Sequence, residues 1–223
     1  ANNFLWMKRL LTAILLFFTF VCSFAQPKFK TEYFANNIIK ITLITDQQWH
    51  NENVSDAVIL KPLKIAREPI TLHLKEGSVL LDKRIDVAVF DSANYRGFLL
   101  PLANDEMIFG GGERALPLNR RGYRLNLYNN PWYGYGEGAD NLNYSVPFIT
   151  SSKGYGLFFD NPSKSFLDIG KKNNEVLEYG ASSGEINVYV IFGNYQQILQ
   201  SYYKLTGTQP LPPRWAFGNL MSR

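Results

Sequence analysis

Residues that could carry chemistry gather between positions 109 and 144 of the chain. Tyrosine, tryptophan, asparagine and glycine alternate there, and few aliphatic side chains interrupt them. Flat aromatic faces beside amide donors and acceptors suit a sugar ring, which has apolar C–H faces and a rim of hydroxyl groups. The same composition is typical of a long glycine-rich loop that its own tyrosines hold in place. The stretch therefore allows two interpretations, a carbohydrate-contact surface and a self-packed loop.

Two carboxylates in this stretch, Glu137 and Asp140, invite an acid/base interpretation. A retaining glycosidase needs such a pair about 5 Å apart, and one of the two has a raised pKa. Glycines surround both residues, and nothing nearby in the sequence would raise either pKa. We therefore interpret them as acceptors for sugar hydroxyls or as solvated loop charges.

Three consecutive glycines, residues 110–112, open the stretch. A phosphate cradle is a weak interpretation, because no Lys-Ser or Lys-Thr pair follows and no strand-loop-helix context is visible. A tight turn or bulge that lets the backbone approach another segment is favoured. We predict that a buried ion pair fixes the root of the loop in preference to a direct ligand contact. Its members would be Glu113 and one of three arginines, Arg114, Arg120 or Arg121.

The bulk composition indicates a folded globular protein. The 223 residues are 46% hydrophobic and 19% charged, which is enough to bury a core. The formal charge of +4 is small and scattered, which argues against nucleic acid as a partner. Cys22 is the only cysteine, and His50 and His73 are the only histidines. We therefore expect no disulfide framework, no metal site, no cofactor and no Ser-His-Asp triad.

Residues 1–25 have the pattern of a leader and secretory signal peptide. Lys8 and Arg9 precede an apolar run over residues 10–21, and small residues follow at the positions that a signal peptidase recognises before its cleavage site. We expect cleavage near Ala25 and a bacterial protein that is periplasmic or secreted, with no membrane attachment after cleavage. A retained membrane helix is the alternative, although the run is short for a bilayer.

From residue 31 onward, short apolar segments alternate with polar turns, which predicts β-strands. Turns recur about every ten residues, a spacing typical of an antiparallel β-sandwich. We assign residues 26–193 to this domain. Its expected strands and apolar runs are residues 38–44, 57–60, 71–74, 79–81, 86–90, 144–151, 155–159, 166–169, 176–179 and 185–192.

A helix and a proline-rich linker are predicted over residues 194–213. Asn194 is a good N-cap, Gln197 stands where a capping box needs it, and Gly207 stands at the C-terminal cap. The prolines of residues 210–213 cannot continue the helix. Residues 214–223 are then predicted to form a buried strand, the first element of a further core.

This C-terminal passage resembles the domain junction of glycoside hydrolase family 31. Residues 203–207 (YKLTG) and 210–218 (PLPPRWAFG) are similar to the passage that joins that family's N-terminal β-sandwich to the first strand of its (β/α)₈ barrel. Residues 109–114 (FGGGER) resemble the family's Gly-x-Gly-Glu motif, and the order and distance between the two passages agree. The chain looks most like bacterial α-glucosidase and 4-α-glucosyltransferase-like members.

The resemblance implies a mainly β fold, a galactose-mutarotase-like antiparallel sandwich followed by one helix and the first strand of a truncated barrel. It implies the N-terminal portion of an exported retaining α-glycosidase that acts on α-linked oligosaccharides, with both catalytic aspartates beyond Arg223 and hence no catalytic residue in this chain. In the family, one sandwich loop reaches over the barrel mouth, and residues 128–140 match it. The candidates for sugar contact are Asn129, Asn130, Trp132 and Tyr133.

A free-standing β-sandwich carbohydrate-binding module is the alternative. In that case the aromatic loop would itself be the binding face.

Overall fold

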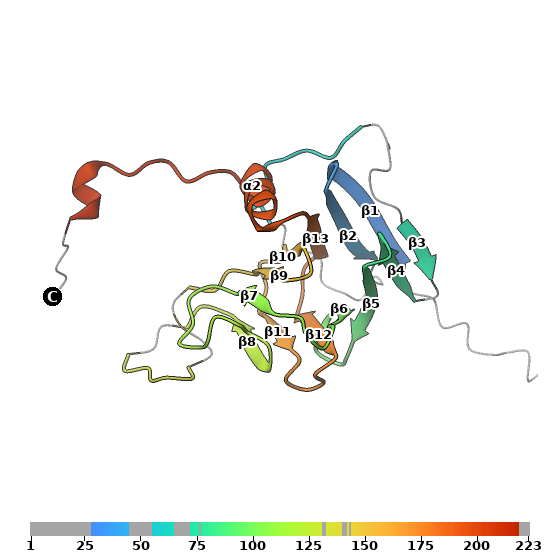
Figure 1. Ribbon diagram of the computed structural model, residues 1–223, viewed down its shortest axis with the longest axis horizontal. Helices are drawn as coiled ribbons and strands as arrows, with labels where there is room; N and C mark the ends of the chain where they lie inside the picture. Colours follow the sequence, from blue (N-terminus) through green and yellow to red (C-terminus); the bar gives the residue numbers. More distant parts are fainter. Residues whose placement is uncertain are drawn as a thin grey trace, which may run out of the picture.

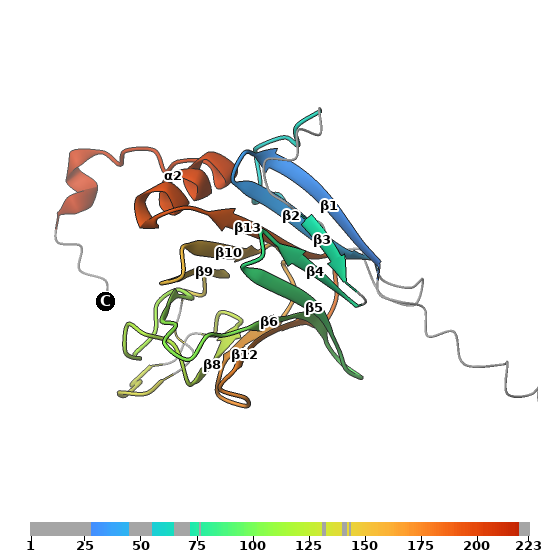
Figure 2. The same cartoon turned by 45° about the vertical axis from the view of Figure 1, so that its right-hand side comes forward.

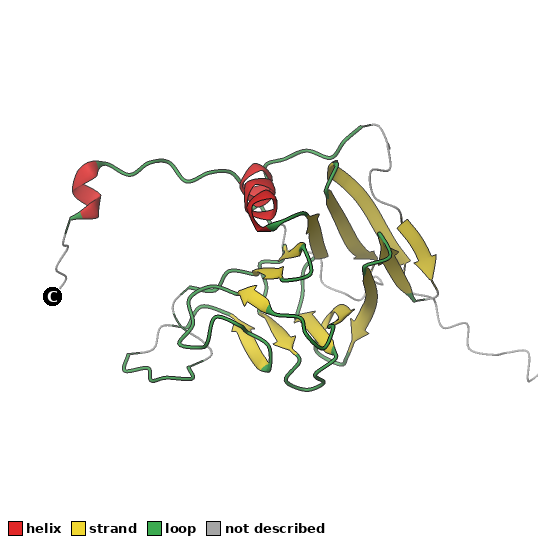
Figure 3. Cartoon of the chain, in the orientation of Figure 1, coloured by secondary structure: helices red, strands yellow, loops and turns green. Residues whose placement is uncertain are grey.

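The computed structural model describes residues 28–44, 55–64, 72–75, 77–130, 133–139, 142 and 144–218. These residues form two stacked β-sheets with one α-helix on the outer face of one sheet (Figures 1 and 3). Every strand pairing in the two sheets is antiparallel. The predicted mainly β sandwich is therefore confirmed. In this part of the chain, no helix has the length and apolar character needed to cross a membrane.

Six strands form the first sheet and seven form the second. The first has the order β1-β2-β13-β10-β9-β7, and the second has the order β3-β4-β5-β6-β12-β11-β8. Strands of the six-stranded sheet are β1 (Lys28–Ala35), β2 (Ile38–Ile44), β7 (Ile108–Gly110), β9 (Phe148–Ser151), β10 (Tyr155–Phe159) and β13 (Ile186–Phe192). Those of the seven-stranded sheet are β3 (Leu72–Lys75), β4 (Ser78–Leu81), β5 (Ile85–Asp91), β6 (Arg96–Pro101), β8 (Tyr123–Leu127), β11 (Ser165–Ile169) and β12 (Val176–Ala181).

The core lies between the sheets and follows from alternation along each strand. On β12, Leu177 and Tyr179 point inward and are fully buried, and Phe98 of β6 lies beside them. The ring of Tyr179 stacks on Phe159 of the other sheet with 4.2 Å between centroids. Burial of one such side chain stabilises the fold by about 1.5–3 kcal/mol, so this seam holds the two layers together.

The helix α2 (Tyr195–Thr206) covers a second apolar cluster on the outer face of the six-stranded sheet. Its predicted capping box is present, because Asn194 Oδ1 accepts from Gln197 N and Gln197 Oε1 accepts from Asn194 N, each at 2.9 Å. Gly207 forms the C-terminal cap as predicted. Tyr202 of α2 stacks on Phe148 with 4.0 Å between centroids, which fixes the helix on the sheet.

Residues 55–64, which we call the strap, run in an extended path beside α2 and β1. The predicted apolar run at residues 57–60 forms no strand, because its amides serve the helix instead. Ile59 N and Leu60 N donate to Leu205 O at 2.9 and 3.3 Å, and Leu63 N donates to Tyr33 O at 2.7 Å. The strap therefore ties the C-terminal end of α2 to the edge of the sheet.

The segment after α2 differs from its prediction. It leaves the sandwich and ends in the short 3₁₀ helix η1 (Arg214–Phe217), well away from both sheets (Figures 1 and 2). Trp215 is 73% exposed and Phe217 is 70% exposed, so the predicted buried strand is wrong for these residues. A strand needs a neighbour for its backbone hydrogen bonds, and the described residues place none beside this segment. Residues 219–223 lie outside the described residues.

Candidate functional site

Arg114 forms the root of the aromatic loop. Its buried guanidinium donates to Gly111 O at 3.2 Å, Asn126 O at 2.9 Å and Ser145 Oγ at 2.9 Å. These acceptors lie on the two chain segments that enter and leave the loop. One side chain therefore holds both ends of residues 128–144 together.

Arg120 and Arg121 brace the segment before the loop in the same way. Arg120 donates to Gly110 O, Leu116 O and Pro117 O at 2.8–3.1 Å. Burial lowers its pKa, but a guanidinium titrates so far above neutral pH that it stays charged. Arg121 donates to Ala103 O, Glu106 O and Asn174 O at 2.6–3.0 Å.

The predicted partner of these arginines is wrong. Glu113 is exposed, and among the described residues no salt bridge joins it to Arg120 or Arg121. Arg114 donates to two carbonyls and a hydroxyl, and it makes further contacts besides these. A guanidinium has five N–H donors in a planar fork, and backbone carbonyls satisfy them where the chain turns sharply. Arginine–carbonyl hydrogen bonds are thus a main part of the root.

The glycine run lets the backbone pass close to the loop's return segment. Gly112 has φ = +87°, and a Cβ placed there would lie 2.3 Å from Tyr144 O. Glu113 N donates to that same Tyr144 O at 2.8 Å. The predicted tight turn is therefore confirmed, since no residue with a side chain fits there without displacement.

A buried carboxylate that sequence reasoning missed completes the root. Glu106 Oε1 accepts hydrogen bonds from Ser151 Oγ and the Tyr155 hydroxyl, and its Oε2 accepts from Ala103 N at 2.9 Å. Burial and the Glu106 carboxylate raise the pKa of Tyr155, so its hydroxyl remains a donor. In the sequence Glu106 looks like an ordinary turn charge. Because all three side chains are buried, we assign them a structural role.

The described loop residues 133–139 extend into solvent. Tyr133 is 95% exposed, and Tyr128, Tyr135 and Tyr144 are also exposed. Gly138 N donates to Ala115 O at 2.8 Å, which fastens the far end of the excursion to the root. Tyrosines that packed the loop on itself would be buried, so the self-packed interpretation does not describe residues 133–139.

The candidate sugar-contact residues fall in different places. Asn129 lies at the base of the loop, where its Oδ1 accepts from Ser145 N at 2.8 Å. Asn130 and Tyr133 are exposed farther along. Trp132 and Asp140 lie outside the described residues. Glu137 is exposed, and no second described carboxylate is paired with it, in keeping with a loop charge.

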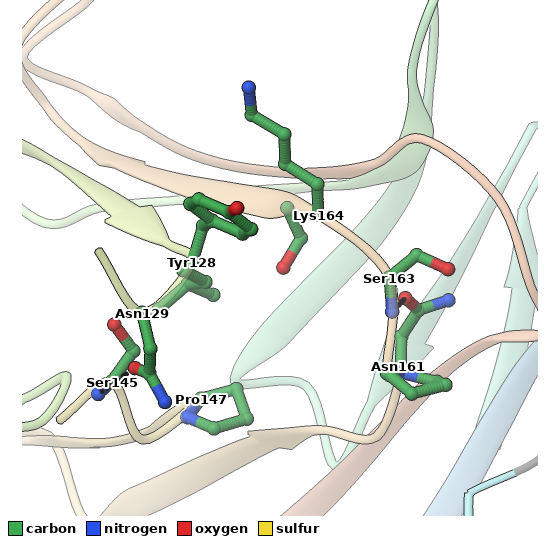
Figure 4. Close-up of a pocket in the computed structure, with 10 residues that line it drawn as sticks. Tyr128, Asn129, Ser145, Pro147, Asn161, Ser163 and Lys164 are labelled. Carbon is green, nitrogen blue, oxygen red and sulfur yellow. Dashed lines mark hydrogen bonds between the residues drawn. The ribbon is translucent and has the colours of Figure 1, made fainter. Parts of the chain in front are cut away.

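A pocket of about 210 Å³ opens beside Asn129. Figure 4 shows Asn129, Ser145 and Pro147 on one side of it, Asn161 and Ser163 on the other, and Tyr128 and Lys164 above. The strand register explains why the residues after β8 lie beside those before β11, because β8 ends at Leu127 opposite Ser165, where β11 begins. Lys164 Nζ lies 5.7 Å from the centre of the Tyr128 ring.

Sequence reasoning did not find Asn161, Ser163 and Lys164. The sequence indicates only that these residues form a turn after β10. Their position beside residue 129 depends on the order of the strands, which the sequence pattern does not give. The pocket offers amide, hydroxyl and ammonium groups beside an aromatic face, a set suited to polar ligands with apolar faces. No described group of three or more His, Cys, Asp or Glu side chains is arranged to hold a metal ion.

Comparisons with known proteins agree with this fold. Residues 43–168 match the glycosyl hydrolase 31 N-terminal galactose mutarotase-like domain. The chain is 32% identical over 126 residues to an alpha-xylosidase of Lactiplantibacillus pentosus, covering 56% of this chain and 16% of that protein. It is 29% identical over 179 residues to an alpha-glucosidase of Saccharolobus solfataricus, covering 78% of this chain and 26% of that protein. The chain thus spans only a minor part of the length of these relatives.

Solved structures give the same result. A Flavobacterium johnsoniae family 31 dextranase complexed with glucose superposes with a TM-score of 0.72 at 28% identity, over 87% of this chain and 27% of that chain. A cycloalternan-forming enzyme from Listeria monocytogenes, at 18% identity and a TM-score of 0.61 over 86% of this chain and 21% of that chain, shares the fold. With the family match covering more than half of the chain, this protein belongs to the N-terminal, galactose-mutarotase-like domains of glycoside hydrolase family 31.

Proposed function

We propose that this chain is the N-terminal portion of an exported retaining α-glycosidase that acts on α-linked glucosides, and that residues 128–140 form one wall of its substrate entrance. One observation carries the proposal. A domain of this family presents an aromatic loop whose tyrosines do not pack on the domain's own sandwich.

The root of the loop supports a positioning role. A wall of a binding site must hold its shape, and Arg114 ties both ends of the loop to buried backbone. The exposed tyrosines beyond this root offer apolar faces and hydroxyl groups to a sugar. Rigid attachment with exposed contact groups is the arrangement that an entrance wall needs.

The direction of the chain after α2 supports the same role. Residues 207–218 leave the sandwich on the side toward which residues 133–139 also project (Figures 1 and 2). A catalytic domain that followed residue 218 would start on that side. The loop would then lie beside it without any rearrangement of the sandwich.

The chemistry would come from the part that the relatives carry and this chain does not span. A retaining glycosidase uses one carboxylate as nucleophile and a second as acid and base. We place both aspartates there and give the residues of this chain the task of binding and orienting the sugar.

Hydrolysis assays test the assignment. The complete protein that carries this chain should cleave isomaltotriose, maltotriose or an aryl α-xyloside, and proton NMR should show the first product in the α configuration. The chain of 223 residues alone should cleave none of them. Failure of the complete protein on all three substrates, or cleavage by the chain alone, would overturn the proposal.

A free-standing carbohydrate-binding module is the second candidate, and the exposure of Tyr133 is the observation that favours it. It requires that the isolated chain bind maltooligosaccharides or isomaltooligosaccharides through the loop. Loss of that binding in Tyr133→Ala would support the module, whereas an entrance wall that lacks its opposite side would add no binding through the loop, so the two proteins would bind alike.

Export is part of the proposal. The leader pattern over residues 1–25 lies outside the described residues and supports export on sequence grounds. Recovery of the protein in the periplasm or medium, with an N-terminus close to Gln26, is the expected outcome; an intact leader on cytoplasmic protein would contradict it.

A further inference from the structure

A second pocket, of about 340 Å³, lies between the strap and the outer face of the six-stranded sheet. We call it the strap pocket. Its floor consists of Phe34, Lys40 and Tyr189, and the strap residues 58–62 cover it. It shares no lining residue with the pocket beside Asn129.

Strand register brings the floor residues together. Tyr189 of β13 pairs with Lys40 of β2 on one side and with Phe158 of β10 on the other, so all three project from the same face. Phe34 packs edge-on against Tyr189 with 5.1 Å between ring centroids. From β2 through β13 to β10, these side chains are therefore an ammonium group, Lys40, followed by two aromatic rings, Tyr189 and Phe158.

The hydroxyl of Tyr189 is one polar group that the strap pocket offers to a ligand. The residue is only 2% exposed, and its hydroxyl makes no hydrogen bond to any described residue. Among the described residues, this hydroxyl is not one of the fully buried polar atoms that lack a partner, so it reaches solvent and can bond to a water or ligand atom there. Since Tyr189 lines the strap pocket, that atom would sit inside it.

Charged groups of both signs surround this hydroxyl. Lys40 Nζ lies 3.4 Å from Glu185 Oε2, which also accepts from Asn187 Nδ2 at 2.7 Å. The buried carboxyl of Asp160 lines the same pocket and is hydrogen-bonded to Ser55 of the strap. The pocket therefore offers donors and acceptors at close range with little net charge.

We propose that the strap pocket binds a neutral polyhydroxylated ligand of monosaccharide size, with its carboxylates accepting from hydroxyl groups and Lys40 and Tyr189 contacting ring or hydroxyl oxygens. A cation is disfavoured by Lys40, and an anion by Asp160 and Glu185. The volume falls at the lower end of the range for ligand sites. The Tyr189 ring is covered, so recognition relies on hydrogen bonds, and this inference is independent of the proposed catalytic role.

The test is calorimetric titration of the full chain with methyl α-D-glucopyranoside, in parallel with NMR spectra that follow the methyl groups of Val58 and Leu60. We expect saturable millimolar binding and shifts of those methyl signals. Tyr189→Phe, which removes only the hydroxyl, should weaken binding about fivefold, the loss of one hydrogen bond. Tyr195→Phe is the matched control, because Tyr195 is exposed on α2 and lines no part of the strap pocket; it should bind like the parent.

Three outcomes would overturn the inference. They are absence of saturable binding, equal affinity of Tyr189→Phe and the parent, and loss of binding in Tyr133→Ala with Tyr189→Phe unaffected. The last result would move the sugar to the aromatic loop. An unchanged denaturation midpoint in Tyr189→Phe would show that its effect on binding is local.

Discussion

Replacement of Arg114 by methionine tests the root of the loop. Arg114→Met keeps much of the apolar stem but removes the donors to Gly111 O, Asn126 O and Ser145 Oγ. A hydrogen bond to a charged group contributes about 1.5–3 kcal/mol, and a buried carbonyl left without a donor carries its own cost. Because Ser145 Oγ can still donate to Asn126 O, at 3.4 Å in the structure, part of the loss is offset. We expect the free energy of unfolding to fall by about 3–5 kcal/mol.

Guanidinium denaturation of the full chain measures this loss, with the midpoint and the slope fitted together. Arg84→Met is the matched control, because Arg84 is 47% exposed on its side chain and pairs with Asp82 on the surface. A surface pair of this kind contributes about 0–1 kcal/mol. If Arg114→Met cost no more than the control, the arginine–carbonyl network would not be what fixes the loop.

Three further changes test other parts of the fold. Gly112→Ala combines a positive φ with a Cβ 2.3 Å from Tyr144 O, so it should destabilise the chain by about 3 kcal/mol in the same denaturation assay; a change within about 0.5 kcal/mol would contradict the close approach. Asn194→Ala removes the capping box and should lower the free energy of unfolding by about 1 kcal/mol. Gln196→Ala is the exposed control, and an equal loss in both variants would contradict the stabilising role of the cap. Burial raises the pKa of the Asp160 carboxyl in the folded chain above its ordinary 3.8. The unfolded chain therefore loses this proton at a lower pH than the folded chain. As the pH rises from about 3.8 through the folded-state pKa, the parent's free energy of unfolding falls. Asp160→Asn should not show this fall, and a constant difference between the two proteins over urea titrations from acid to neutral pH would refute the assignment.

Much of the sandwich was predictable from the sequence because strand patterning is local. The bounds of β2 and β10 agree with the predicted segments, and the capping box at Asn194 needs only residues three apart. Residues 144–147 were predicted to extend β9, but Tyr144 O accepts from Glu113 N and Ser145 N donates to Asn129 Oδ1, so these two residues pair with the loop base. Competition between the sheet and the loop decided that boundary.

The details of the candidate site were less predictable because they depend on which strands meet. Composition identified the aromatic loop and its arginines but gave the wrong partner for Glu113, since an arginine can be satisfied by carbonyls that no sequence pattern reveals. The strap pocket forms only where β1, β2 and β13 meet the strap, which lies more than 100 positions before β13 in the sequence. The segment η1 failed for a different reason. Its apolar sequence predicted a buried strand, but its side chains are exposed because no described strand lies beside it.

Residues 128–140 are proposed to form a wall of the substrate entrance in an α-glycosidase. The most direct measurement compares steady-state hydrolysis of isomaltotriose by the complete protein and by its Tyr133→Ala variant, with Tyr203→Ala, exposed on α2, as control. Loss of one aromatic–sugar contact at the entrance should raise KM about fivefold and leave kcat within about twofold, while the control matches the parent. An unchanged KM in Tyr133→Ala, in an enzyme that does hydrolyse the substrate, would contradict the account.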